Sequence, residues 1–265
     1  MKVYISVDIE GVAGITHWDE ATKGHPDYPE FREQMTREAI AACEGARAAG
    51  AGEIWVKDAH SSGRNLILDR LPSGVKLIRA WAGHPLCMLQ ELDESFTAVM
   101  MIGYHAAAGS EGNALAHTLS LSPQRITIND RPASEFLIHA YGAEMLSVPT
   151  VFVSGDEALA EEIRDLNPAI GTCAVKRGVG ASTVTMTPAD AVTAIREGAA
   201  KALSRSLGAC RLALPDRFSV DISYGDPVTA YRMAWYPGAQ HVGERTVRFE
   251  TKDYLDVLRM LNFLT

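Results

Sequence analysis

The sequence contains few cysteines, and they lie far apart. Its four cysteines, Cys43, Cys87, Cys173 and Cys210, form no CxxC pair. This spacing argues against a zinc ribbon and favours buried free thiols in a reducing compartment. Long apolar runs are also lacking, because the longest ones, such as residues 98–102, are far too short to cross a bilayer. We therefore expect no membrane partner.

No cluster of lysine and arginine stands out, and the formal net charge is -8. Nucleic acid and anionic membranes are therefore not expected as partners. The apolar start of the chain is interrupted by Asp8 and Glu10, and no small-residue cleavage site follows, unlike a secretory signal peptide. These features predict a cytoplasmic protein.

Short apolar runs alternate with helical patterns over most of the chain. Its 265 residues, 47% of them hydrophobic and 22% charged, suffice for one large globular domain or for a main domain with a smaller appendage. Strands are predicted at residues 3–9, 53–56, 75–78, 98–103, 126–128, 150–154 and 173–175. Helices are predicted at residues 28–49, 134–146, 156–166 and 188–207. This alternation predicts a three-layer α/β fold with a largely parallel central sheet.

The pattern changes near Pro215. Strands are predicted at residues 219–224 and 246–250, and helices at residues 227–235 and 254–263. We therefore predict a main α/β domain over residues 1–214, which carries the candidate site described below. A small α+β segment over residues 215–265 is expected to pack on it.

Carboxylate and imidazole side chains follow three of the predicted strands. Asp8 and Glu10 end the first strand, where alternation would place them on one face, about 7 Å apart. Asp58 and His60 follow the second strand, and His105 follows the fourth. Ligands of open α/β sheets bind beyond the carboxyl ends of the strands, so we expect these side chains to gather at one edge.

This combination of side chains indicates a metal site. Two convergent acids are costly unless a cation lies between them, because like charges repel when they are partly desolvated. Mixed imidazole and carboxylate ligands suit zinc, with manganese or cobalt as alternatives. More than four such ligands would be too many for one tetrahedral zinc ion. The sharper hypothesis is therefore a two-metal site with a bridging carboxylate.

Two further segments carry residues of the same kinds. His117 lies within residues 113–118, and Glu135 follows a turn that opens a helix with Ser134 as its N-cap. The residues alone leave Glu135 open between a metal ligand and a helix-dipole or capping carboxylate. Surface or capping roles are expected for the histidines without strand-end placement, which are His17, His25, His84, His139 and His241.

Together these segments resemble the DppA-type zinc D-aminopeptidases, a family of ring-forming peptidases. The resemblance rests on five strings in the family's order: SVDIEG (6–11), DAHS (58–61), GYHA (103–106), AHTL (116–119) and INDRPASE (128–135). It extends over nearly the whole chain. It is loose at KRGVGAST (176–183) and weak beyond Arg217, and both departures concern substrate selectivity rather than the metal ligands.

The resemblance implies both the site and the activity. It implies a binuclear zinc site ligated by Asp8, Glu10, His60, His105 and Glu135. It makes His117 the non-ligand catalytic residue, acting as nucleophile or as general acid/base. It further implies removal of the N-terminal residue from short peptides, with D-amino acids as the first expected substrates, and assembly into a homodecameric ring.

Two other functions compete with the aminopeptidase. A two-metal phosphoesterase also uses Asp and His at strand ends, but this sequence has no cluster of Arg or Lys there to hold a phosphate. A metal-stabilised ring scaffold without catalysis is the third possibility, and the non-ligand His117 argues against it. The residues do not rank D-, L-, glycyl and β-amino substrates.

Overall fold

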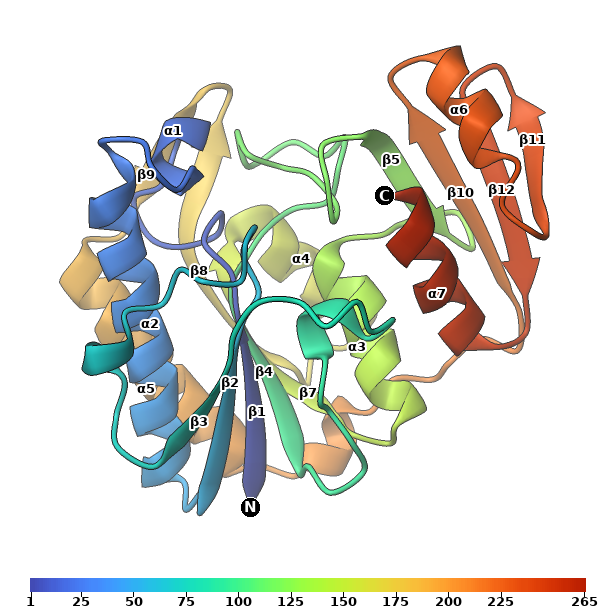
Figure 1. The fold of residues 1–265 in the computed structure, drawn as a ribbon. Helices are drawn as coiled ribbons and strands as arrows, with labels where there is room; N and C mark the ends of the chain where they lie inside the picture. The colour runs from blue at the N-terminus through green and yellow to red at the C-terminus, as the bar shows by residue number, and fades with distance from the viewer.

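The computed structural model describes residues 1–265 and contains two sheets (Figure 1). The larger sheet is formed by β1 (Lys2–Val7), β2 (Glu53–Asp58), β3 (Val75–Ile78), β4 (Ala98–Tyr104), β7 (Thr150–Asp156), β8 (Gly171–Val179) and β9 (Ser182–Thr185). Its strand order is β3-β2-β1-β4-β7-β8-β9, and every pair of neighbours is parallel except β8 and β9. The predicted largely parallel sheet is therefore confirmed.

Helices cover both faces of this sheet. The helices α2 (Tyr28–Ala48) and α5 (Pro188–Leu203) pack together on one face, and α3 (Glu135–Met145) and α4 (Glu157–Leu166) lie on the other (Figure 1). The three-layer prediction is thus correct. None of the helices combines the length and the apolar composition needed to span a membrane.

The ends of these helices follow from local sequence. The side chains of Ser134, Asp156 and Thr187 cap α3, α4 and α5 by accepting hydrogen bonds from backbone N–H groups in the first turn. Helix α5 ends at Leu203 rather than at the predicted residue 207. Ser204, Ser206 and Gly208 are weak helix formers, and a short 3-10 turn, η3 (Leu207–Cys210), follows instead.

The second sheet is antiparallel and lies beside the main body (Figure 1). It comprises β5 (Pro123–Ile128), β6 (Arg131–Pro132), β10 (Phe218–Tyr224), β11 (Ala239–Gly243) and β12 (Thr246–Thr251), in the order β11-β12-β10-β5-β6. Helices α6 (Pro227–Met233) and α7 (Tyr254–Leu264) complete this region. The C-terminal α+β segment is therefore present.

The strand at residues 123–128 belongs to this second sheet and not to the parallel one. In the β5–β10 pairing, Val220 lies opposite Ile128 and Ile222 opposite Ile126, so alternate apolar residues of both strands share one buried face. The second sheet thus draws on two separated stretches of chain. The division into two domains at residue 214 stays a prediction.

Several short elements were not predicted from the sequence. They include the one-turn helix α1 (Trp18–Ala21) and the edge strands β6, β9 and β11. Strand β8 also runs well beyond the predicted residues 173–175, because it continues as one arm of a hairpin with β9. These edge strands carry exposed polar residues in place of apolar runs, so hydrophobic periodicity does not predict them.

Candidate metal centre

The predicted ligands lie at the carboxyl ends of three neighbouring strands. Asp8 directly follows β1, His60 lies two residues after β2, and His105 directly follows β4. Within this sheet, β1 is followed by β2 on one side, and β4 is followed by β7 on the other. The site therefore occupies the point where strand order reverses, which is where open α/β sheets bind ligands.

The turn that carries Asp8 and Glu10 depends on close backbone packing. Strand β1 ends at Val7, so strand alternation does not align the two acids, and the sequence-based reason for their convergence is wrong. They converge because the chain turns: the Gly11 N–H donates to the Gly103 carbonyl at 2.8 Å. A Cβ at Gly11 would lie 1.8 Å from the Tyr104 carbonyl oxygen, so only glycine fits.

Asp8 lies between two histidines. Its Oδ1 is 3.3 Å from His60 Nδ1, and its Oδ2 is 3.5 Å from His105 Nε2. Glu10 Oε2 lies 3.1 Å from the same His60 nitrogen, and Glu135 Oε2 lies 3.5 Å from the same His105 nitrogen. We call Asp8, Glu10 and His60 the His60 subsite, and Asp8, His105 and Glu135 the His105 subsite. The two subsites share Asp8.

Backbone carbonyls fix the orientation of both histidines. His60 Nε2 lies 2.8 Å from the Ala21 carbonyl oxygen, and His105 Nδ1 lies 3.0 Å from that of Ala106. A carbonyl only accepts hydrogen bonds, so these two nitrogens carry hydrogen and donate. The other nitrogen of each ring faces the carboxylates, as the ring of a metal-ligating histidine does.

The cluster carries an excess of negative charge that calls for a cation. Burial by itself lowers the pKa of His60 and His105, but the neighbouring carboxylates outweigh it and raise both well above the usual 6.5. Burial by itself raises the pKa of Asp8 and Glu135, but the adjacent histidines outweigh it and lower both to about 2. A positively charged group beside these carboxylates therefore stabilises their ionised form, and they stabilise its charge in return.

Unpartnered atoms test whether a metal fits. Glu10 Oε2, His105 Nε2 and Glu135 Oε2 are buried and have no hydrogen-bond partner in the protein. Buried polar atoms without a partner are costly, and each of these three atoms is of a kind that binds metal ions. The donor set, three carboxylates and two imidazoles, is one that zinc accepts. The residues present therefore fit a metal centre.

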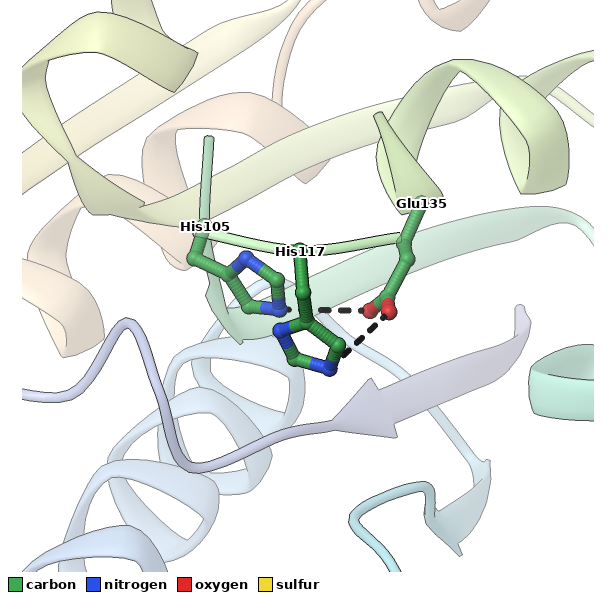
Figure 2. Close-up of side chains that lie close together, drawn as sticks. All are labelled: His105, His117 and Glu135. Carbon is green, nitrogen blue, oxygen red and sulfur yellow. Dashed lines mark ion pairs between the residues drawn. The ribbon is translucent and has the colours of Figure 1, made fainter. Parts of the chain in front are cut away.

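His117 lies against the His105 subsite (Figure 2). Its ring stacks on that of His105, with centroids 4.5 Å apart and planes 11° from parallel. Its Nε2 is 3.7 Å from Glu135 Oε1, an oxygen that already accepts a hydrogen bond from the Leu119 N–H at 2.7 Å. The Trp18 ring also packs against the His117 ring in a T-shaped arrangement, at 5.2 Å between centroids. His117 is thus within reach of an ion, but it faces the carboxylate oxygen that is already satisfied.

Asp58 lies outside the cluster, contrary to the expectation that it could be a ligand. Its carboxylate accepts hydrogen bonds from the backbone N–H groups of Asn65 and Leu66 and from the Asn65 side chain. The Asn65 amide also donates to the His60 carbonyl at 2.6 Å. Asp58 therefore shapes the loop that carries His60.

A buried lysine that was not predicted as part of the site holds the Glu10 turn. Lys176 of β8 donates from Nζ to the carbonyls of Glu10, at 2.6 Å, and Ile15, at 2.9 Å. The Asn113 amide donates to the same Glu10 carbonyl at 3.1 Å. Burial lowers the pKa of Lys176 to about 8, although nearby carboxylates, first Asp156, oppose this shift. The only sequence signal was a lysine that ends an apolar run.

A second buried group, Glu38 of α2, supports the same turn. Its Oε1 accepts hydrogen bonds from the Ala13 N–H at 2.9 Å and from the Gln34 side chain at 2.8 Å. Burial raises the pKa of Glu38 to about 7. The segment after Glu10 is therefore fixed from the helix side as well as from β8.

A cavity of about 520 Å³ opens beside the metal cluster. Asp8, Glu10, His60, His117 and Glu135 line one part of it. Apolar side chains line another part, including Met88, Ile138, Leu258 and Leu261. Two of these come from α7, so the C-terminal segment forms part of the cavity wall. The cavity is large enough for a short peptide beside the metal cluster.

Two of the remaining histidines, His17 and His139, show whether the predicted surface or capping roles hold. His17 caps α1 by accepting from the Asp19 N–H, as the expected capping role requires. His139, for which a surface or capping role was expected, is 1% exposed and lines the cavity. That expectation is wrong, because Glu135 and His139 are one turn apart on α3 and face the same side.

Three comparisons with known proteins agree. The sequence model of a family described as D-aminopeptidase matches residues 1–263. A D-aminopeptidase of Bacillus subtilis (strain 168) is 33% identical over 267 residues, which is 100% of this chain and 97% of the relative. A solved structure of the Zn-dependent D-aminopeptidase DppA from Bacillus subtilis, a self-compartmentalizing protease, matches with a TM-score of 0.92 and 30% identity. That match covers 100% of this chain and 96% of the solved one.

Proposed function

Because the chain belongs to the D-aminopeptidase family, peptidase M55, we propose that it is a zinc-dependent enzyme that removes D-amino acids from the N-terminus of short peptides. We propose further that Asp8, Glu10, His60, His105 and Glu135 bind two zinc ions per chain. The observation that carries this proposal is the position of Asp8, whose two oxygens face two different histidines.

The shared carboxylate favours two ions over one. A single tetrahedral zinc ion takes four ligands, and this cluster offers five side chains in two subsites. In the proposed arrangement one ion has Asp8, Glu10 and His60, and the other has Asp8, His105 and Glu135. A carboxylate that bridges two metals is common in two-metal hydrolases. The similar enzyme from Bacillus subtilis is described as Zn-dependent, which supports zinc as the metal.

His117 is the proposed catalytic residue. When bound, zinc supplies a Lewis acid for the scissile carbonyl and makes water more acidic. His117 Nδ1 donates to the Leu115 carbonyl at 3.0 Å, so in the neutral ring the Nε2 lone pair is free at the cavity. From there Nε2 can take a proton from an attacking water molecule and return it to the leaving amine, or it can itself attack the scissile carbonyl. Contacts with the rings of Trp18 and His105 restrict the orientation of the His117 ring.

The competing functions have less support. No observation favours a phosphoesterase, and family membership favours the peptidase. A catalytically silent scaffold would leave the positioned His117 and the adjoining cavity without a role.

A substrate panel tests the proposed function. The purified protein is assayed on D-alanyl, L-alanyl, glycyl and β-alanyl p-nitroanilides and on p-nitrophenyl phosphate, before and after chelation, with zinc content measured in parallel. The expected result is D-alanyl hydrolysis that chelation abolishes and zinc restores, at two ions per chain. Hydrolysis of the phosphate ester alone, or zinc-replete protein without activity, would contradict the proposal.

Self-assembly is the second part of the proposal, with the decameric ring as the expected form. The similar Bacillus subtilis enzyme is described as self-compartmentalizing. In this chain Val228, Tyr231 and Trp235, on or next to α6, are 76%, 60% and 73% exposed. Large exposed apolar side chains that lie together are typical of protein interfaces. Sedimentation velocity tests this part: a monomer at micromolar concentration would contradict it.

A further inference from the structure

One histidine in the cavity has no part in the metal cluster. The His139 side chain is buried and lines the cavity, and its Nε2 has no hydrogen-bond partner in the protein. It lies one helical turn after Glu135 on α3, so both side chains reach the cavity from the same helix face. The other unpartnered atoms in this region, on Glu10, His105 and Glu135, belong to the proposed metal ligands.

The hydrogen bonds of His139 define what its free nitrogen can do. Nδ1 lies 2.7 Å from the Glu135 backbone carbonyl, which can only accept, so Nδ1 carries hydrogen and donates. In the neutral ring Nε2 is therefore an acceptor. A buried acceptor without a donor is costly, and His139 is one of the residues that line the cavity in which a ligand carrying a donor would bind.

We propose that His139 Nε2 accepts a hydrogen bond from the α-amino group of the bound peptide and so positions its N-terminal residue. This inference rests on the proposed aminopeptidase function, because a free α-amino group is the donor that every substrate of such an enzyme carries. Ile138, the neighbour of His139 on α3, adds apolar surface to the same cavity.

Two substitutions separate this role from a purely structural one. In His139→Asn the side-chain amide can still donate to the Glu135 carbonyl, as Nδ1 does, but no acceptor remains at the Nε2 position. In His139→Gln the side-chain oxygen can reach the Nε2 position, while the bond to the Glu135 carbonyl is lost. His139→Asn therefore retains the hydrogen bond to the Glu135 carbonyl, and His139→Gln retains the proposed acceptor for the substrate.

Wild type is assayed first on D-alanyl-p-nitroanilide, so failure of the proposed function shows as an inactive zinc-replete wild type. For the active enzyme we expect His139→Asn to raise KM about tenfold, with kcat and zinc content within about twofold, and His139→Gln to recover most of the loss. Tenfold corresponds to about 1.4 kcal/mol, within the range for an ordinary hydrogen bond.

Direct binding provides a measurement that does not depend on turnover. Calorimetry should show D-alanine bound about tenfold more weakly by zinc-loaded His139→Asn than by wild type. Propionate, which lacks the amino group, should bind equally to both proteins. Unchanged binding of D-alanine by His139→Asn, an equal loss for propionate, or a larger defect in His139→Gln than in His139→Asn would each overturn the proposal.

Discussion

Lys176 and Glu10 are joined by a hydrogen bond of 2.6 Å between the lysine Nζ and the glutamate backbone carbonyl. The lysine is on β8, next to the edge strand β9, and the glutamate follows β1, which β4 and β7 separate from β8 in the same sheet. The bond leaves the Glu10 carboxylate free to face His60. A buried charge thus fixes the backbone of a proposed metal ligand without occupying its side chain.

Replacement of Lys176 by methionine should weaken zinc binding. Methionine keeps most of the apolar stem but leaves the carbonyls of Glu10 and Ile15 without their charged donor. Loss of a group that orients a ligand typically lowers metal affinity about 10–100-fold. Zinc titration against a competing chelator measures this change, with the exposed neighbour Arg177→Met as control. Equal zinc affinities of the two variants would exclude a positioning role for Lys176.

The bridging role of Asp8 predicts a difference in metal stoichiometry. Glu10→Gln removes a carboxylate from the His60 subsite alone, so we expect about one zinc ion per chain. Asp8→Asn weakens both subsites, and less than one ion should remain. Atomic absorption after gel filtration measures the content, and the exposed Glu161→Gln serves as control. Identical stoichiometries for the two site variants would show that Asp8 does not bridge.

His117→Ala should remove turnover and leave the metal in place. Loss of a general base or a nucleophile lowers kcat by about 100-fold or more. Because His117 faces the Glu135 oxygen that Leu119 already satisfies, zinc content should not change. The comparison is with the exposed His241→Ala. A variant that retains only one zinc ion would instead identify His117 as a ligand.

Glu38 predicts a pH dependence of stability. Its pKa is about 7 in the folded protein and about 4.5 in its ordinary state, so the folded state retains a proton that the unfolded chain releases. This stabilises the fold at low pH, and the effect is lost as pH rises from about 4.5 through 7.

Glu38→Gln removes this titration and keeps the oxygen that accepts from Ala13. Relative to the variant, wild type should lose about 2 kcal/mol of unfolding free energy between pH 5 and 8, an order-of-magnitude value from the shift. Urea unfolding of both proteins across this range measures the difference, and other titrating groups cancel. Parallel curves would mean that Glu38 does not retain its proton.

Much of the fold and most of the candidate metal ligands could be predicted from local patterns. Buried parallel strands are apolar runs, so the strands at residues 3–9, 53–56 and 98–103 were predicted, and with them the positions of Asp8, Glu10, His60 and His105. Glu135 could not be separated from a capping residue by its local sequence. Only the resemblance to a family singled it out, since its partner His105 is distant in the chain.

The residues that were missed act through long-range contacts. Lys176 meets Glu10 across 166 positions, and nothing near either residue indicates the pairing. His139 faces inward because α3 lies against both β4 and α7, so its helix has no exposed polar stripe. The second sheet was assigned incompletely for the same reason, because β5 pairs with β10 across about ninety residues.

Helix α7 forms part of the cavity wall but carries none of the proposed metal ligands. All five proposed ligands precede residue 136, whereas Leu258 and Leu261 enter the cavity from the last helix. An exchange of residues 254–264 between relatives would therefore alter the surface offered to a substrate side chain and leave the ligand-bearing part of the gene untouched. This part of the apolar cavity wall and the proposed metal ligands are therefore encoded in separate stretches of the gene.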